Sequence, residues 1–265
     1  MIRKPAVAGQ FYPDNPATLE EVVKAYMRDG TEESFTALIV PHAGYIYSGS
    51  TAGRVFARAR IPDSVVLIGP NHTGLGKKVS VMGEGSWEIP LGIIDVDKEL
   101  AGRLLAYPLF SSDKEAHIYE HSLEVELPFI YTKNPHASIV PITVMPLGYR
   151  ECVELGIAIA DVIRQSRKEV LIVVSSDMNH YESDDVTRQK DMMAIERILS
   201  LDPEGLYTIT RRKNITMCGV VPATIALVAA KELGATEATL IEHTTSAQTS
   251  GDYDHVVGYA GIGIK

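Results

Sequence analysis

Three histidines and one cysteine stand where this chain could carry metal or acid–base chemistry. His42, His72 and His180 occur in the segments ALIVPHAGY, VVLIGPNHTG and LIVVSSDMNHY, each shortly after the end of an apolar run. Cys218 lies in TMCGVVPATIALVAAKEL, just before a strongly apolar helical pattern. Imidazole and thiolate groups bind iron, copper and zinc, and imidazole also transfers protons near neutral pH. These residue types therefore predict a metal site with proton-transfer chemistry beside it.

The elements that position these side chains follow a repeating strand–helix pattern, which is typical of an α/β fold. Buried strands are predicted at residues 35–40, 64–68, 138–144 and 169–174, and two more, of undetermined direction, at about 237–242 and 255–264. Helices are predicted at about residues 16–28, 50–59, 97–105, 122–132, 150–165, 184–199 and 219–233. We expect a single domain over residues 1–265, with a mainly parallel or mixed central sheet flanked by helices. Parallel strands end at one sheet edge, so the three histidine loops should converge there.

Two residues near these loops have both a functional and a structural interpretation. Asp177 precedes His180 by three positions and either orients that imidazole, binds a metal or caps a turn. Cys218 at a helix start has its thiolate favoured by the helix dipole, or is a small buried residue.

Polar and aromatic residues in the same segments are further candidates. Glu120 and His121 precede SLEVELPFI and either face the same edge or form a polar helix start. Aromatic side chains commonly wall such clefts, although they also form cores. The candidates for the cleft wall are Tyr45, Tyr47, Trp87, His121 and Tyr181. The residues read as surface or structural are His117, His136, His243 and His255, and Cys152 is assigned no chemistry.

Composition narrows the class of partner. The 265 residues are 45% hydrophobic and 22% charged with a formal net charge of −9, which argues against electrostatic capture of nucleic acid or an anionic membrane. The sequence has no secretory signal pattern, no apolar stretch of membrane-spanning length and two cysteines, so we expect a cytoplasmic protein. The expected partner is a small molecule or a peptide held in the cleft.

Seven segments in colinear order resemble the Memo family. They are AGQFYP, PHAGYIYSG, GPNHTG, WEIPLG, EHSLEVELPFI, SSDMNHY and MCG, and together they span nearly the whole chain. The resemblance implies a fold similar to class III extradiol dioxygenases, which are non-haem iron enzymes. It also implies association with AMMECR-type and radical-SAM proteins, the AmmeMemoRadiSam grouping.

The resemblance assigns a role to each candidate. His42 and His72 take the places of the two histidine ligands, Cys218 replaces the carboxylate ligand, and His180 takes the place of the acid–base histidine. This replacement argues against true dioxygenase activity, because a thiolate is a softer ligand than a carboxylate and favours copper, zinc or a differently tuned iron.

Three functions compete on these residues. The first is a metal-dependent oxidoreductase with Fe(II) or copper, or else zinc, on His42, His72 and Cys218, and proton transfer by His180. The second is a metal-free hydrolase with Cys218 as nucleophile, His180 as base and Asp177 orienting it. The third is a non-enzymatic module that holds a phosphorylated or acidic peptide in the cleft.

Overall fold

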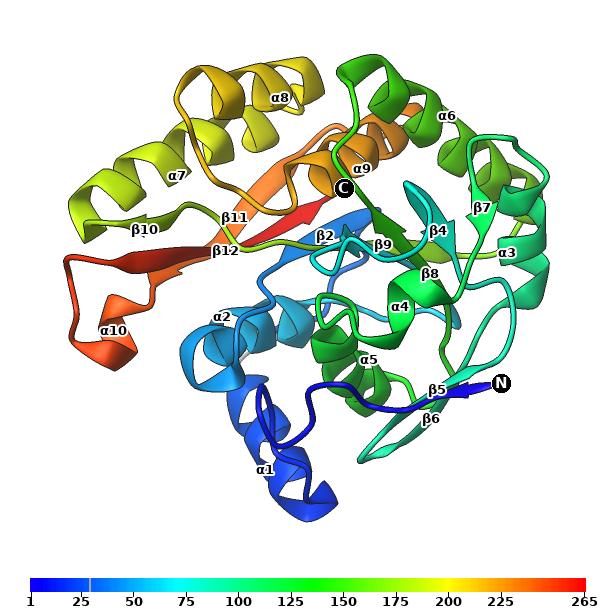
Figure 1. Ribbon diagram of the computed structural model, residues 1–265, viewed down its shortest axis with the longest axis horizontal. Coiled ribbons are helices and arrows are strands. Elements are labelled where there is room, and N and C mark those ends of the chain that lie inside the picture. Colours follow the sequence, from blue (N-terminus) through cyan, green and yellow to red (C-terminus); the bar gives the residue numbers. More distant parts are fainter. Residues whose placement is uncertain (29) are drawn as a thin grey trace.

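A mixed β-sheet runs through the middle of the protein, as the computed structural model shows for residues 1–28 and 30–265 (Figure 1). Its strands follow the order β10-β12-β2-β9-β3-β8-β4-β7, and β11 also pairs with β12. Their bounds are β2 Ala37–Val40, β3 Ser64–Pro70, β4 Val79–Val81, β7 Ser111–Ser112, β8 Ser138–Val144, β9 Val170–Ser175, β10 His180–Glu182, β11 Ala238–Thr245 and β12 Val256–Ile264. The fold class expected from the sequence is therefore confirmed.

The four central strands β2, β9, β3 and β8 are parallel. The runs ALIV and VLIVVS are buried at every position, because helices cover both faces of this part of the sheet. The strands predicted without a direction, β11 and β12, pair antiparallel with each other, and β12 also pairs antiparallel with β2. The sheet is thus parallel where the histidine loops leave it, β12 joins β2 antiparallel on one side, and on the other side β4 joins β8 antiparallel and β7 joins β4 in parallel.

Helices form a layer on each side of the sheet (Figure 1). One layer contains α1 (Pro16–Tyr26), α2 (Tyr45–Arg58) and α5 (Leu127–Lys133), which contact one another. The other contains α6 (Tyr149–Ser166), α7 (Asp184–Leu199), α8 (Pro203–Arg212) and α9 (Val220–Glu232). Helix α9 packs against α6, α8 and three strands, which explains why its sequence is apolar on all sides.

Shorter elements complete the fold. A small sheet joins β1 (Ile2–Arg3), β5 (Ser86–Ile89) and β6 (Gly92–Asp95), and α3 (Lys98–Leu105), which follows β6 along the chain, packs against α6 and β8. The segment before α5 contains α4 (Glu115–Ile118) and the 3-10 helix η1 (Glu124–Glu126), and α10 is Ala247–Ser250. One hydrophobic core extends from Val7 to Ile264. In the part of the chain that the structure describes, no helix has both the length and the apolar character needed to cross a bilayer.

Candidate metal centre

The site lies where the parallel strands end, and the expected convergence occurs. His42 follows β2, His72 follows β3, and Cys218 precedes α9, whose start reaches the same edge. One potential ligand atom from each of these residues lies within 4.8 Å of the other two. His180, at the start of β10, lines a cleft of about 490 Å³ together with His42 and His72.

A defined network orients the ring of His42. Its Nδ1 lies 2.7 Å from the Ser175 hydroxyl, which donates its single proton to the Ser122 carbonyl at 2.5 Å. Nδ1 must therefore carry the proton and donate to Ser175, which leaves a lone pair on Nε2. That Nε2 lies 3.3 Å from the Cys218 sulfur. Burial, assisted by the nearby rings of His121 and His72, lowers the pKa of His42 well below its usual value.

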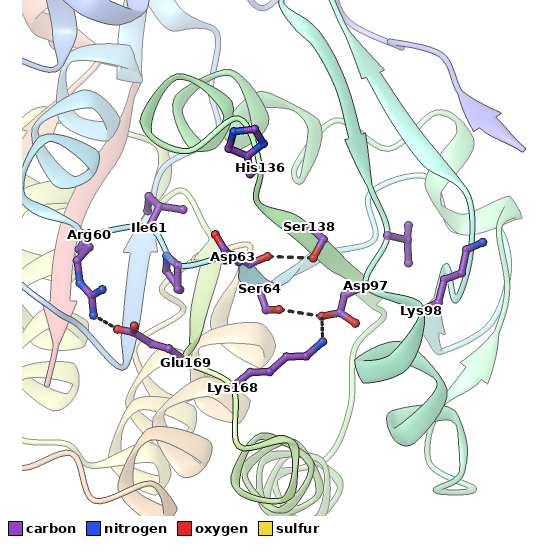
Figure 2. Close-up of a pocket in the computed structure, with 12 residues that line it drawn as sticks. Arg60, Ile61, Asp63, Ser64, Asp97, Lys98, His136, Ser138, Lys168 and Glu169 are labelled. Atoms are coloured by element: carbon purple, nitrogen blue, oxygen red, sulfur yellow. Dashed lines mark hydrogen bonds and ion pairs between the residues drawn. The ribbon is translucent and has the colours of Figure 1, made fainter.

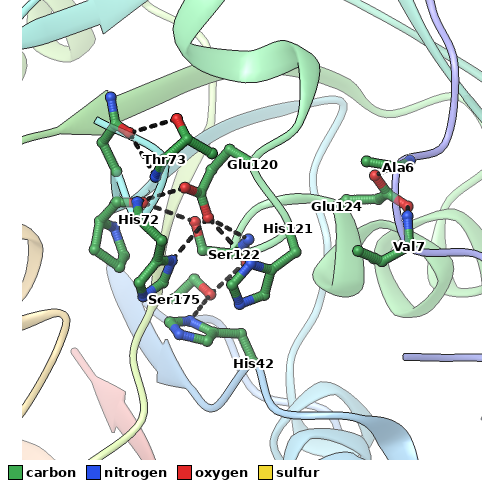
Figure 3. Close-up of polar contacts among 12 residues, drawn as sticks. Ala6, Val7, His42, His72, Thr73, Glu120, His121, Ser122, Glu124 and Ser175 are labelled. Carbon is green, nitrogen blue, oxygen red and sulfur yellow. Dashed lines mark hydrogen bonds and ion pairs between the residues drawn. The ribbon is translucent and has the colours of Figure 1, made fainter. Parts of the chain in front are cut away.

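A buried carboxylate orients His72 (Figure 3). Glu120 accepts hydrogen bonds from the His72 backbone at 2.5 Å, from its Nδ1 at 2.8 Å and from the Ser122 backbone at 2.9 Å. Burial works to raise the pKa of Glu120, but these hydrogen bonds outweigh it and the pKa falls to about 2. The carboxylate is ionised and accepts the Nδ1 proton of His72, so Nε2 of His72 is also free to bind a metal.

His121 is the third imidazole of the cluster, so Glu120 and His121 do face the predicted edge. Its ring stacks on His72 with centroids 4.7 Å apart, and its Nδ1 lies 3.5 Å from Glu120. His72, Glu120 and His121 form a second group with metal-ligand spacing. His121 also lines the cleft. From the sequence, His121 was assigned only to the cleft wall. Its position beside a helix start does not indicate that three imidazole rings meet there.

The thiol of Cys218 differs from the expectation that a helix start favours its thiolate. Burial and the nearby Asp177 raise its pKa well above the usual value, so the thiol is neutral in the protein alone. Its sulfur accepts the Asp177 backbone N–H at 3.3 Å. Loss of hydration therefore outweighs the partial positive charge of the α9 start.

Asp177 and His180 are not partners, which corrects the predicted orientation of this imidazole. His180 donates from Nδ1 to the Thr216 carbonyl at 2.9 Å, and its backbone N–H donates to the Thr216 hydroxyl at 2.8 Å. Asp177 instead accepts the His42 backbone N–H at 2.8 Å, and burial raises its pKa to about 7. Thr216 thus leaves Nε2 of His180 free, while Asp177 joins two loops. Burial also lowers the pKa of His180.

The aromatic predictions are partly met. Tyr47, Tyr181 and His121 line the cleft, as do Phe11 and Tyr259, which the sequence did not single out. The exposed His255, interpreted from the sequence as surface or structural, also lies in the cleft wall. Tyr181 has a φ of 62°, an uncommon backbone conformation for an aromatic residue. Tyr45 is buried beneath the site and donates to the Val125 carbonyl at 2.7 Å.

Trp87 does not wall the cleft, contrary to the prediction. It lies in β5 of the small sheet, fully buried, with the Arg3 guanidinium 4.2 Å from its ring. The motif WEIPLG is the β5–β6 hairpin, and it packs the core near the amino terminus.

A wider cavity of about 850 Å³ lies at the other ends of the strands, near the starts of β3, β8 and β9 (Figure 2). Several of its charged groups are paired: Asp97 accepts from Lys168 at 3.1 Å and from Ser64 at 2.8 Å, and Arg60 pairs with Glu169. His136 lies in its wall, which agrees with the surface role predicted for it. The histidine cluster, and not this cavity, therefore contains the candidate chemistry.

A family model described as Memo-like protein matches residues 3–263. The chain belongs to the Memo family. Relatives named MEMO1 family protein include one from Aquifex aeolicus, 43% identical over 98% of each chain, and one from Methanosarcina barkeri, 42% identical over 100% of each. A third, from Methanopyrus kandleri, is 40% identical over 99% of this chain and 98% of its own. The resemblance seen in the sequence motifs is thereby confirmed.

The fold is also found in a solved structure. An uncharacterized protein from Escherichia coli K12 superposes with a TM-score of 0.52 at 14% identity, covering 85% of this Memo family chain and 99% of the other. At this low identity the likeness shows a shared fold alone.

Proposed function

We propose that this Memo family protein binds a transition metal ion on His42, His72 and Cys218. The donor set fits: both histidines have Nδ1 held by a neighbour and Nε2 free, and the sulfur lies 3.3 Å from Nε2 of His42. Two imidazoles and one thiolate leave coordination positions open, as redox-active iron and copper centres require. This arrangement of free donor atoms is the observation that carries the proposal.

The function that this site best supports is metal-dependent oxidoreductase chemistry on a molecule held in the cleft. A bound iron or copper ion would supply electron transfer and would polarise a ligand at its open positions. The chain itself supplies the cleft, with Phe11, Tyr47, Tyr181 and Tyr259 in its walls. These aromatic surfaces suit a small molecule or a peptide side chain with an apolar face.

His180 would hold and transfer a proton at Nε2. Its Nδ1 is occupied by the Thr216 carbonyl, and its lowered pKa keeps the ring neutral and able to accept a proton. The hydrolase alternative fits the geometry less well. Cys218 lies beside His42, and Asp177 bonds to the His42 backbone, so the proposed nucleophile, base and orienting acid do not form a chain.

Metal content separates the ligands from the proton-transfer residue. We expect anaerobically purified protein titrated with Fe(II), Cu(I), Cu(II) or Zn(II) to bind about one ion per chain, as a single three-donor site allows. His42→Ala and Cys218→Ser should lose most of this metal, whereas His180→Ala should keep it. His136→Ala, in the distant cavity, is the matched control. Elemental analysis and chelator competition provide the readout.

Two outcomes would contradict this assignment. Failure of all four ions to bind reduced protein would remove the metal centre. Loss of metal from His180→Ala as complete as from His42→Ala would make His180 a ligand. Once a substrate is known, His180→Ala should lower turnover by roughly 10²–10⁴-fold, the usual contribution of general acid–base catalysis.

A further inference from the structure

A second cavity, separate from the histidine-lined cleft, also reaches the candidate metal ligands. Its volume is about 570 Å³, and it lies between the end of β8 and the α8–α9 connection. Of the three candidate ligands, His42 lines the cleft, Cys218 lines the second cavity and His72 lines both. The three side chains therefore lie between two cavities, and Cys218 is part of the wall of the second one.

The interior of this second cavity is mostly apolar. Its lining includes Val144, Met145, Ile215, Met217, Val221 and Pro222. The volume falls within the roughly 300–1,000 Å³ of pockets that hold small molecules. Such a lining favours a hydrocarbon body, because burying apolar surface from both partners is favourable.

The lining also contains polar residues, among them Asn71, Thr210, Asn214 and Thr216, and a cation, Arg211. Arg211 is exposed, and its guanidinium lies 3.6 Å from the Tyr207 ring centre. It donates a long hydrogen bond of 3.5 Å to the Tyr207 carbonyl. Within residues 1–28 and 30–265, no carboxylate pairs with Arg211. Stacking on Tyr207 holds the guanidinium plane, and its remaining N–H groups suit a two-point contact with a carboxylate.

The residues that follow Arg211 in the sequence are also positively charged. Arg211, Arg212 and Lys213 are consecutive at the end of α8, in a chain whose net charge is −9. An anion approaching this acidic protein therefore meets a local basic patch at the second cavity.

We propose that the second cavity binds an aliphatic monocarboxylic acid. Its carboxylate would pair with the Arg211 guanidinium, and its hydrocarbon chain would extend inward toward His72 and Cys218. An apolar lining with one stacked, unpaired arginine matches a ligand that has one anionic end and a hydrocarbon body. The proposal does not depend on the metal centre, since binding is measured in metal-free protein. If the protein failed to bind a metal, the prediction of carboxylic acid binding would be unaffected. If the protein failed to bind octanoate, the proposed metal centre would likewise be unaffected.

Octanoate is the probe, with octanamide as its neutral analogue. Calorimetry on metal-free protein should show that octanoate binds more tightly than octanamide. Arg211→Gln should weaken octanoate binding by about tenfold to a hundredfold, the effect of losing a charge-assisted contact, and should leave octanamide almost unchanged. Arg212→Gln, the neighbouring arginine outside the lining, is the matched control and should weaken octanoate binding far less than Arg211→Gln does, because it removes a charge of the patch but no direct contact.

The position of the hydrocarbon chain of octanoate is tested separately. Met145→Trp should fill the cavity and abolish octanoate binding while the far-ultraviolet circular dichroism is retained. In the unaltered protein, octanoate should shift the methyl NMR signals of Met145 and Met217, which line the cavity, while the signal of the buried Met82, outside the lining, serves as the internal reference. The proposal is overturned if octanoate does not bind, if Arg211→Gln and Arg212→Gln behave alike, or if the Met145 and Met217 signals do not move. The NMR test needs no substitution and stands even if Met145→Trp fails to fold.

Discussion

At the scale of single residues, the site depends on groups that hold the imidazoles as much as on the imidazoles themselves. Ser175 fixes the Nδ1 proton of His42, and Glu120 holds both the backbone and the ring of His72. Such partners of metal ligands set the tautomer and the ring orientation. Glu120 is fully buried, and its carboxylate accepts three N–H groups.

This arrangement makes Glu120→Gln informative. A glutamine has one accepting oxygen and one donating amide, so it cannot accept all three N–H groups. We expect metal affinity to fall about 10–100-fold, the usual effect of removing a partner of a metal ligand. Chelator competition measures the change, and Glu115→Gln, at an exposed position in α4, is the control. Equal affinity in the two variants would mean that Glu120 has no part in holding His72.

At the scale of elements, the amino-terminal strand is tied to the segment that carries Glu120. The buried Arg3 pairs with Glu124 at 2.5 Å and donates to the carbonyls of His117 at 2.8 Å and Glu120 at 2.7 Å. Glu124 also accepts the backbone N–H groups of Ala6 and Val7 (Figure 3). Residues 1–7 therefore support the loop that positions His72.

Removal of Arg3 tests this support. Arg3→Ala leaves Glu124 buried without its cation and should lower the free energy of unfolding by about 3–5 kcal/mol. Lys4→Ala is the matched control, because Lys4 pairs with Glu88 at an exposed position, and should change it by less than about 1 kcal/mol. Denaturant unfolding measures both. A similar small loss in the two variants would show that the buried pair adds no stability.

Strand direction explains which parts of this organisation were predictable. The runs at residues 35–40 and 64–68 are apolar and each leads into a histidine, so these strands and the convergence of His42 and His72 could be predicted. The short strands β4 to β7 lack such runs and were missed, which is why Trp87 was misplaced. Asp177 was misassigned because closeness in an irregular loop does not determine where a side chain points. Helix α8 was not predicted, so the position of Arg211 near its end, beside the second cavity, was not predicted either.

At the scale of the whole molecule, stability should depend on pH through His117, which was expected to be surface or structural. It is completely buried, and burial, together with the nearby Arg3, lowers its pKa to about 4. Within the described residues, neither ring nitrogen has a hydrogen-bond partner. The unfolded chain binds this proton below a pH of about 6.5, whereas the folded protein does so only near the lower value.

As the pH falls from about 6.5 toward 4, only the unfolded state gains the His117 proton, so the free energy of unfolding should drop by about 3 kcal/mol from this residue. His117→Phe keeps a ring beside Trp87 and removes the titration. Denaturant unfolding between neutral and acidic pH should therefore show a shallower decline in the variant. Identical declines would exclude His117 as a contributor.

The position of β12 limits when the protein can fold during its synthesis. Residues 256–264 lie between β11 and β2, so the edge of β2 that faces β12 cannot be covered until this segment has left the ribosome. Pairing of such distant segments is slow, because a long loop must close before any contact forms. A ribosome-bound chain ending before residue 256 should therefore remain sensitive to protease, although β2, β9, β3 and β8 have all been made. Release of those nine residues, and not completion of the parallel core, becomes the event that commits the nascent chain to its native state.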